Sequence, residues 1–171
     1  LDEDKKEDII ELYERIGEIC LEEGGEDVLI ADTPLNLKRV WEMRQNIHEA
    51  LVHYGLLADE DVVVPLREVK VLIPEARAIA ERYHLEVSFF GHLGDGNIHV
   101  NFLKKGLKKT EVEIPQAVIK ELFVLAAKLE GKVSGEHGIG VVKRPYLSLT
   151  VEPYYLELKR KIKNIFDPQG L

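Results

Sequence analysis

The sequence lacks the features that mark disulfide-bonded, membrane-spanning or nucleic-acid-binding proteins. It has 171 residues and one cysteine, Cys20, so no disulfide can form within the chain, and we expect a reducing compartment and a cytoplasmic protein. No run approaches the roughly 18 uninterrupted apolar residues that a membrane span needs. Twenty-three basic against 31 acidic residues give a net charge of −8, which disfavours nucleic acid and anionic membranes as main partners. A small anionic substrate would therefore need a locally positive site, supplied by a metal ion or an arginine.

Signals for targeting and for nucleotide binding are also missing. Leu1 is followed at once by acidic residues, whereas a secretory leader begins with basic residues and continues with an apolar stretch. No expected strand leads through a glycine fingerprint into a helix, so a Rossmann or P-loop nucleotide site is not predicted. The sequence has no internal repeat and no composition shift. Its length and its 45% hydrophobic content predict one domain over residues 1–171.

Apolar residues at helical spacing predict the helices. Residues 4–23 carry one stripe that ends at Cys20, which we expect in the core, and two glycines follow. A second helix should begin at Pro34, after Asp32 or Thr33, and run to about Gly55. Pro74 predicts a break in the next helical segment, because proline fits poorly inside a helix. Two further helices are predicted, over residues 118–129 and 155–165.

Short β-rich runs predict an antiparallel sheet. Residues 28–30 and the three valines of residues 61–65 have strand composition. Residues 87–93 and 98–103 are two further runs, joined by the hairpin punctuation Gly-Asp-Gly-Asn. Strands mixed with helices in this order favour an α+β fold, an antiparallel sheet with helices packed on one face.

Two short segments concentrate the residues that carry chemistry. They are GHLGDGNIH at residues 91–99 and SGEHGIG at residues 134–140. The period of two along a strand places His99 and Asn101 on one face. A tight hairpin could bring His92 close to His99. Two imidazoles and a carboxylate make a three-ligand site with open positions, typical of a catalytic divalent metal.

Glu136 is the natural third ligand in that arrangement, and it leaves its neighbour His137 free to act as a base. Spacing alone leaves a plainer interpretation open. Histidines around a hairpin can serve as hydrogen-bonding partners of the turn, and a Glu-His pair in a loop can be solvated.

The two segments resemble the C-terminal domain of FAD-linked oxidases, the group of glycolate oxidase D subunits, D-lactate dehydrogenases and D-2-hydroxyglutarate dehydrogenases. FDPQGL at residues 166–171 completes the resemblance, which extends back to WEMR at residues 41–44 and EDVVVP at residues 60–65. The resemblance implies a ferredoxin-like cap domain. It also implies FAD, bound mainly by an FAD-binding domain or subunit that this sequence does not include.

Site roles follow from the resemblance residue by residue. His92, His99 and Glu136 match the metal ligands, usually assigned as zinc, and His137 matches the proposed general base. Asn101 matches a substrate-contacting asparagine. Arg44 matches the arginine that pairs with the substrate carboxylate, a task suited to a planar, permanently charged guanidinium. The implied reaction is oxidation of a 2-hydroxy acid to a 2-oxo acid, with His137 taking the hydroxyl proton and the flavin taking the hydride.

The sequence also departs from the family pattern. Where the hydroxyglutarate enzymes carry a lysine for the second carboxylate, this sequence has Asp59, which argues against a dicarboxylate and for a glycolate or D-lactate type of substrate. Three alternatives stay open: a natural separate subunit that is completed by an FAD-binding chain, a non-enzymatic metal- or ligand-binding module, and a metal-dependent hydrolase. His48, His53 and His84 are expected to have no role in the site.

Overall fold

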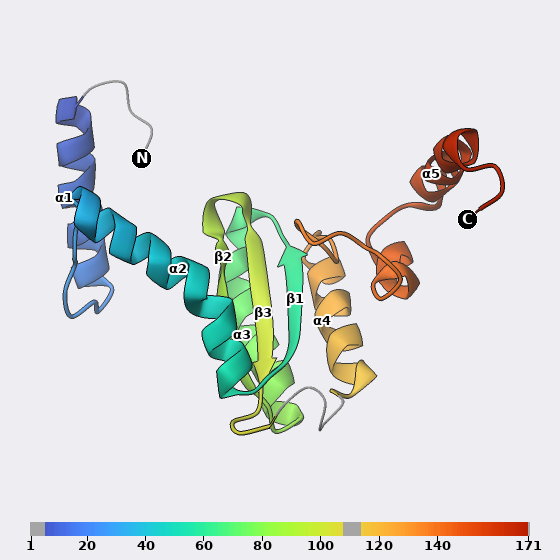
Figure 1. Ribbon diagram of the computed structural model, residues 1–171, viewed down its shortest axis with the longest axis horizontal. Coiled ribbons are helices and arrows are strands. Elements are labelled where there is room, and N and C mark those ends of the chain that lie inside the picture. The colour runs from blue at the N-terminus through green and yellow to red at the C-terminus, as the bar shows by residue number, and fades with distance from the viewer. Residues whose placement is uncertain (1–5, 108–113, 171) are drawn as a thin grey trace. The chain divides into compact units, whose positions relative to one another are not determined.

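The computed structural model describes residues 6–107 and 114–170, which form two compact units (Figure 1). The N-terminal unit extends to Ile47 and contains α1 (Lys6–Glu22) and most of α2 (Pro34–Tyr54). The larger unit begins at His48 and contains the sheet and the remaining helices. Among the helices of the described ranges, none combines the length and the apolar character needed to cross a bilayer.

In the N-terminal unit the two predicted helices are confirmed, and two finer predictions are wrong. The expected strand over residues 28–30 is irregular chain, and Leu29 is 89% exposed. Cys20, expected in the core, is exposed. The described part of this unit holds two helices and no strand, so residues 28–30 have no ladder to join. α2 begins at Pro34, as predicted. The Thr33 hydroxyl caps this end of the helix, because it accepts a hydrogen bond from the Asn36 amide at 3.2 Å.

The larger unit is built on a three-stranded antiparallel sheet in the order β1-β3-β2. The strands are β1 (Leu56–Val63), β2 (Glu86–His92) and β3 (Asn97–Leu103). This confirms the predicted hairpin and the valine-rich strand, although β1 begins earlier than residue 61. The first half of β1 was not predicted, because it contains the acidic residues 59–61 and charged side chains are uncommon in buried strands.

Gly96 closes the hairpin between β2 and β3. Its φ of +69° lies in the left-handed region, and a Cβ there would approach the Val64 carbonyl oxygen to 2.0 Å. Glycine is therefore required at this position, and the close turn sets the register that places His92 beside Asn97 on β3.

A helical layer packs against one face of the sheet. It contains α3 (Val69–Arg82), which lies behind the sheet in Figure 1 and contacts β2, and α4 (Gln116–Lys128), which contacts both α3 and β1. The core joins Val62 of β1 and the alternate β3 residues Ile98, Val100 and Phe102 to apolar side chains of both helices. The predicted α+β class, with helices packed on an antiparallel sheet, is confirmed.

The predicted break at Pro74 is wrong, because α3 continues through this residue. Pro74 is exposed, so its ring lies on the solvent side while Leu72, Ala76 and Ile79 are buried against the sheet. Burial of this face, at roughly 25 cal/mol per Å² of apolar surface, outweighs the one hydrogen bond that proline cannot donate. After α4 come the glycine-rich loop, a 3₁₀ segment over Arg144–Leu149 and α5 (Pro153–Phe166), which confirms the last predicted helix.

Candidate metal and substrate site

The face of the sheet opposite α3 and α4 is polar. Antiparallel pairing sets Asp61 of β1 and Phe90 of β2 opposite His99 of β3, and sets Asp59 and Ser88 opposite Asn101. Directly paired residues project to the same side of a sheet. His99 therefore lies in the middle of a polar face, and its ring stacks on Phe90 with centroids 4.9 Å apart.

The three predicted metal ligands converge. The Nε2 atom of His99 lies 2.9 Å from Oε1 of Glu136, and Nε2 of His92 lies 3.5 Å from the same oxygen. One candidate ligand atom from each residue fits within 4.8 Å of the others. Ligands bound at about 2.1 Å to a tetrahedral zinc ion lie about 3.4 Å apart, so this donor set and its spacing fit a divalent cation. The side chains of His92 and Glu136 are 48% and 45% exposed, which leaves coordination positions open to a small ligand.

The loop that carries Glu136 is held by one buried carboxylate. Oδ2 of Asp61 accepts the backbone amides of Gly135, Glu136 and His137 at 2.8, 2.6 and 2.8 Å. The hydroxyl of Ser134 also donates to Asp61, at 3.2 Å. Asp61 is completely buried on β1. A carboxylate that accepts several amides in this way fixes the loop relative to the strand.

Lys143 balances the charge of Asp61. Its ammonium is buried and donates to Oδ1 of Asp61, with Glu60 3.5 Å away. Burial opposes ionisation of Asp61, yet hydrogen bonds from Lys143 and from the loop amides outweigh it and lower the pKa of the carboxyl to about 2. Burial raises the pKa of the Glu60 carboxyl, and the charge of Lys143 acts against that rise. Asp61 is thus the ionised anchor of the loop.

Gly135 lets the loop approach the sheet closely. A Cβ at this position would lie 2.5 Å from Cγ and Oδ1 of Asn97, a buried residue at the start of β3. The loop therefore needs glycine here to bring Glu136 within reach of the two histidines.

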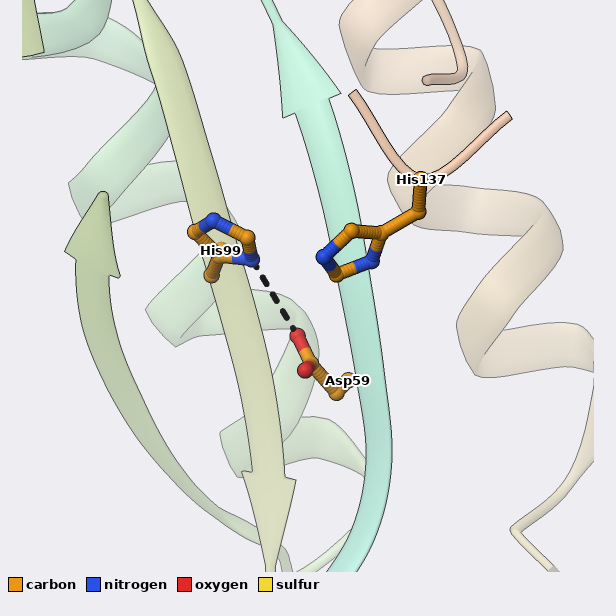
Figure 2. Close-up of side chains that lie close together, drawn as sticks. All are labelled: Asp59, His99 and His137. Atoms are coloured by element: carbon orange, nitrogen blue, oxygen red, sulfur yellow. Dashed lines mark ion pairs between the residues drawn. The ribbon is translucent and has the colours of Figure 1, made fainter. Parts of the chain in front are cut away.

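His137 borders the predicted metal cluster from the side of β1. Its ring centroid lies 4.9 Å from that of His99, and its Nδ1 lies 3.7 Å from Oδ1 of Asp61. Figure 2 shows the imidazole of His137 directed toward His99 and Asp59. These three residues form a second group able to hold a cation, and this group shares His99 with the first.

Asp59 lies between two histidines. Its Oδ1 is 3.5 Å from Nδ1 of His99, the ion pair dashed in Figure 2, and its Oδ2 is 3.4 Å from Nδ1 of His48. The Asp59 side chain is 17% exposed, whereas that of His99 is 5% exposed. His48 was expected to have no role, yet it contacts the acid that borders the site.

The two predicted substrate residues differ in their surroundings. Asn101 is completely buried, and its amide donates to the His99 carbonyl at 3.2 Å and to the Ser88 carbonyl at 3.4 Å. Its Oδ1 has no hydrogen-bond partner among the described residues, so one acceptor is left for a ligand. Arg44 lies on α2 in the N-terminal unit, and its role stays a prediction.

Sequence patterns missed the residues that support the loop. Asp61 was expected only as part of a valine-rich strand, and Lys143 was not singled out. One signal was present, because an aspartate beside three valines of a buried strand needs a compensating partner. That partner could not be identified from sequence, since Lys143 lies 82 positions away.

Comparison with known proteins identifies the family. A family model described as FAD linked oxidases, C-terminal domain, matches residues 1–171, and the chain belongs to this family. A D-lactate dehydrogenase of Anaerostipes hadrus is 33% identical over 169 residues, covering 98% of the chain and 36% of that protein. A D-2-hydroxyglutarate dehydrogenase of Stutzerimonas stutzeri (strain A1501) is 33% identical over 159 residues, 90% of the chain and 34% of that protein.

A glycolate oxidase subunit GlcD of Bacillus subtilis (strain 168) is 30% identical over 159 residues, 92% of the chain and 34% of that protein. The chain thus spans about a third of the length of these curated relatives. The relatives have enzyme names with three different substrates at nearly the same identity. Similarity therefore shows the FAD-linked oxidase family and does not single out one substrate.

Proposed function

We propose that this chain is the substrate-capping, metal-binding part of an FAD-dependent enzyme that oxidises a 2-hydroxy acid to a 2-oxo acid. The observation that carries the proposal is the convergence of His92, His99 and Glu136 beside His137, in a chain of the FAD-linked oxidase family. An FAD-binding domain or subunit is the implied partner, and the reaction needs it. We extend the proposal to both units as one capping domain of a cytoplasmic enzyme.

In this proposal His92, His99 and Glu136 hold a divalent cation, with zinc as the first candidate. A cation held there lowers the pKa of a hydroxyl that coordinates it and so favours loss of the hydroxyl proton. Two features support the cation: the spacing of the ligand atoms and the exposure of two of the three ligands.

His137 is the proposed base. Its Nδ1 faces the Asp61 carboxylate at 3.7 Å, so Asp61 favours the tautomer that carries its proton on Nδ1. Nε2 then keeps a lone pair that can accept the hydroxyl proton. Asp61 would thus orient the base as well as the loop.

The oxidation itself depends on the FAD-binding partner. The hydroxyl proton would pass to Nε2 of His137, and FAD held by the partner domain would accept the α-hydrogen with its electron pair as the 2-oxo acid forms. FAD, when bound, supplies the redox chemistry. Arg44 neutralises the substrate carboxylate in this proposal, and Oδ1 of Asn101 accepts a hydrogen bond from the substrate.

Asp59 favours a monocarboxylate substrate, of the glycolate or D-lactate type. Its carboxylate lies 3.5 Å from Nδ1 of His99, at the border of the proposed metal centre. A second carboxylate on the substrate would add a like charge beside that of Asp59, which is unfavourable in a partly desolvated site.

The test is turnover by the chain joined to its FAD-binding partner, with glycolate, D-lactate and D-2-hydroxyglutarate offered separately. We expect anaerobic bleaching of the flavin by a monocarboxylate, and loss of that bleaching in Glu136→Gln and His137→Ala. The matched control is His53→Ala, an exposed histidine of α2, which should bleach normally. Hydrolysis of esters by the isolated chain, without flavin reduction in the complex, would contradict the proposal.

A further inference from the structure

His99 faces a carboxylate on each of its two ring nitrogens. Its Nε2 lies 2.9 Å from Glu136, and its Nδ1 lies 3.5 Å from Asp59. A neutral imidazole has one lone pair and one N–H, so it can offer only one nitrogen to a cation. The two groups that share His99 therefore cannot both bind a cation through a neutral ring.

We propose that Asp59 is a positioning residue, which accepts the Nδ1–H of His99 and thereby directs the Nε2 lone pair to the cation held with His92 and Glu136. The inference rests on the proposed function, because it presupposes a cation at that centre. It assigns Asp59 a structural part in the site and identifies which of the two groups is the metal centre.

Unpaired buried atoms support this assignment. Oδ1 of Asp59 and Nδ1 of His99 are both buried, and neither has a hydrogen-bond partner among the described residues. Leaving such atoms unpaired is unfavourable, because each has lost contact with water without gaining a partner in the protein. They face each other at 3.5 Å, so a shift of about half an ångström would make an ordinary hydrogen bond between them.

Solvent exposure also favours the group of His92, His99 and Glu136 as the metal centre. On the Nε2 side of the ring, His92 and Glu136 are about half exposed, as a cation that also binds substrate requires. On the Nδ1 side, Asp59 is 17% exposed and its other oxygen faces His48. His137 already faces Asp61 and keeps a role as base only if it binds no cation. The result is a carboxylate–imidazole–cation series, which fixes the tautomer and the orientation of the ring.

The test is imidazole nitrogen NMR of the ¹⁵N-labelled chain loaded with Zn²⁺, together with Zn²⁺ affinity measured by competition with a chelator. We expect a metal-bound Nε2 and a protonated Nδ1 at His99. In Asp59→Ala the affinity should fall about 10- to 100-fold. In Asp59→Asn it should fall less, because the amide oxygen still accepts the Nδ1 proton. His53→Ala should bind as the unsubstituted chain does.

Three outcomes would count against the reasoning, in different ways. Zinc on Nδ1 of His99 with the proton on Nε2 would overturn the inference and place the cation with Asp59 and His137. Unchanged zinc affinity in both Asp59 variants would also overturn it. Failure of the folded, unsubstituted chain to bind Zn²⁺ at all would instead refute the metal centre of the proposed function.

Discussion

Replacing Asp61 by alanine tests how the loop that carries Glu136 is anchored to β1. The change removes the acceptor of three backbone amides and takes from buried Lys143 the carboxylate to which it donates, while Glu60 stays 3.5 Å away. A carboxyl whose pKa falls from 3.8 to about 2 on folding stabilises the ionised folded chain by about 2.5 kcal/mol. Removing one partner of a buried ion pair costs about 3–5 kcal/mol. We expect Asp61→Ala to lower the free energy of unfolding of the larger unit by about 3 kcal/mol.

Two assays check this magnitude. Urea unfolding followed by far-ultraviolet circular dichroism gives the global change, and the melting temperature should fall on the order of 10 °C. Hydrogen exchange followed by mass spectrometry gives the local change, because the amides of residues 135–137 lose their acceptor and should exchange faster. The matched control is Glu157→Ala, which removes an exposed ion pair with Lys161 on α5 and should cost less than about 1 kcal/mol.

The reasoning is refuted if Asp61→Ala unfolds within about 1 kcal/mol of the unsubstituted chain. It is also refuted if exchange at residues 135–137 stays protected, because the loop would then be held by something other than this carboxylate. Asp61→Asn separates charge from acceptor capacity. It should retain part of the loop protection and lose the ionic contribution of the pair with Lys143.

Three further predictions concern pH, packing and substrate. Because folding lowers the pKa of Asp61, the contribution of its carboxylate to the free energy of unfolding is complete above about pH 4 and is lost toward pH 2. The free energies of unfolding in urea of the unsubstituted chain and of Asp61→Ala should therefore differ less at about pH 2 than at about pH 6. Gly135→Ala adds a Cβ 2.5 Å from the Asn97 side chain, so Zn²⁺ affinity should fall at least about tenfold with little loss of helix content by circular dichroism. Asp59→Lys removes a carboxylate beside His99 and adds a cation, so, with Zn²⁺ in excess to offset its weaker binding, the ratio of kcat/KM for D-2-hydroxyglutarate to that for D-lactate should rise at least about tenfold. A constant ratio would exclude Asp59 from substrate selection.

Local patterns predicted the regular elements well. Helix periodicity identified α1, α2, α4 and α5, and the glycine-rich turn identified the β2–β3 hairpin, because each signal lies within one element and its ends. The failures involved tertiary context. Residues 28–30 have strand composition but no neighbouring strand in the described part of their unit, and α3 tolerates Pro74 because only its opposite face is buried.

Local motifs predicted part of the candidate site, whereas other parts depend on tertiary contacts. The hairpin predicted that His92 and His99 lie close together, and the SGEHGIG motif suggested Glu136 as third ligand and His137 as base, roles that the family resemblance also implies. The convergence of the loop with the hairpin was not predictable from spacing, because it depends on one carboxylate of β1 that accepts amides 74–76 positions further along the chain. The contact of Asp59 with His99 likewise arises from strand pairing across β1 and β3, which places both side chains on one face.

Metal content tests the central claim most directly. Elemental analysis of the purified, chelator-treated and Zn²⁺-reloaded chain should find one equivalent of zinc, and His92→Ala and Glu136→Ala should each lose it while remaining folded by circular dichroism. His53→Ala, the control histidine outside the cluster, should retain it. Equal zinc in both ligand variants and the unsubstituted chain would contradict the assignment of His92, His99 and Glu136 as the metal centre.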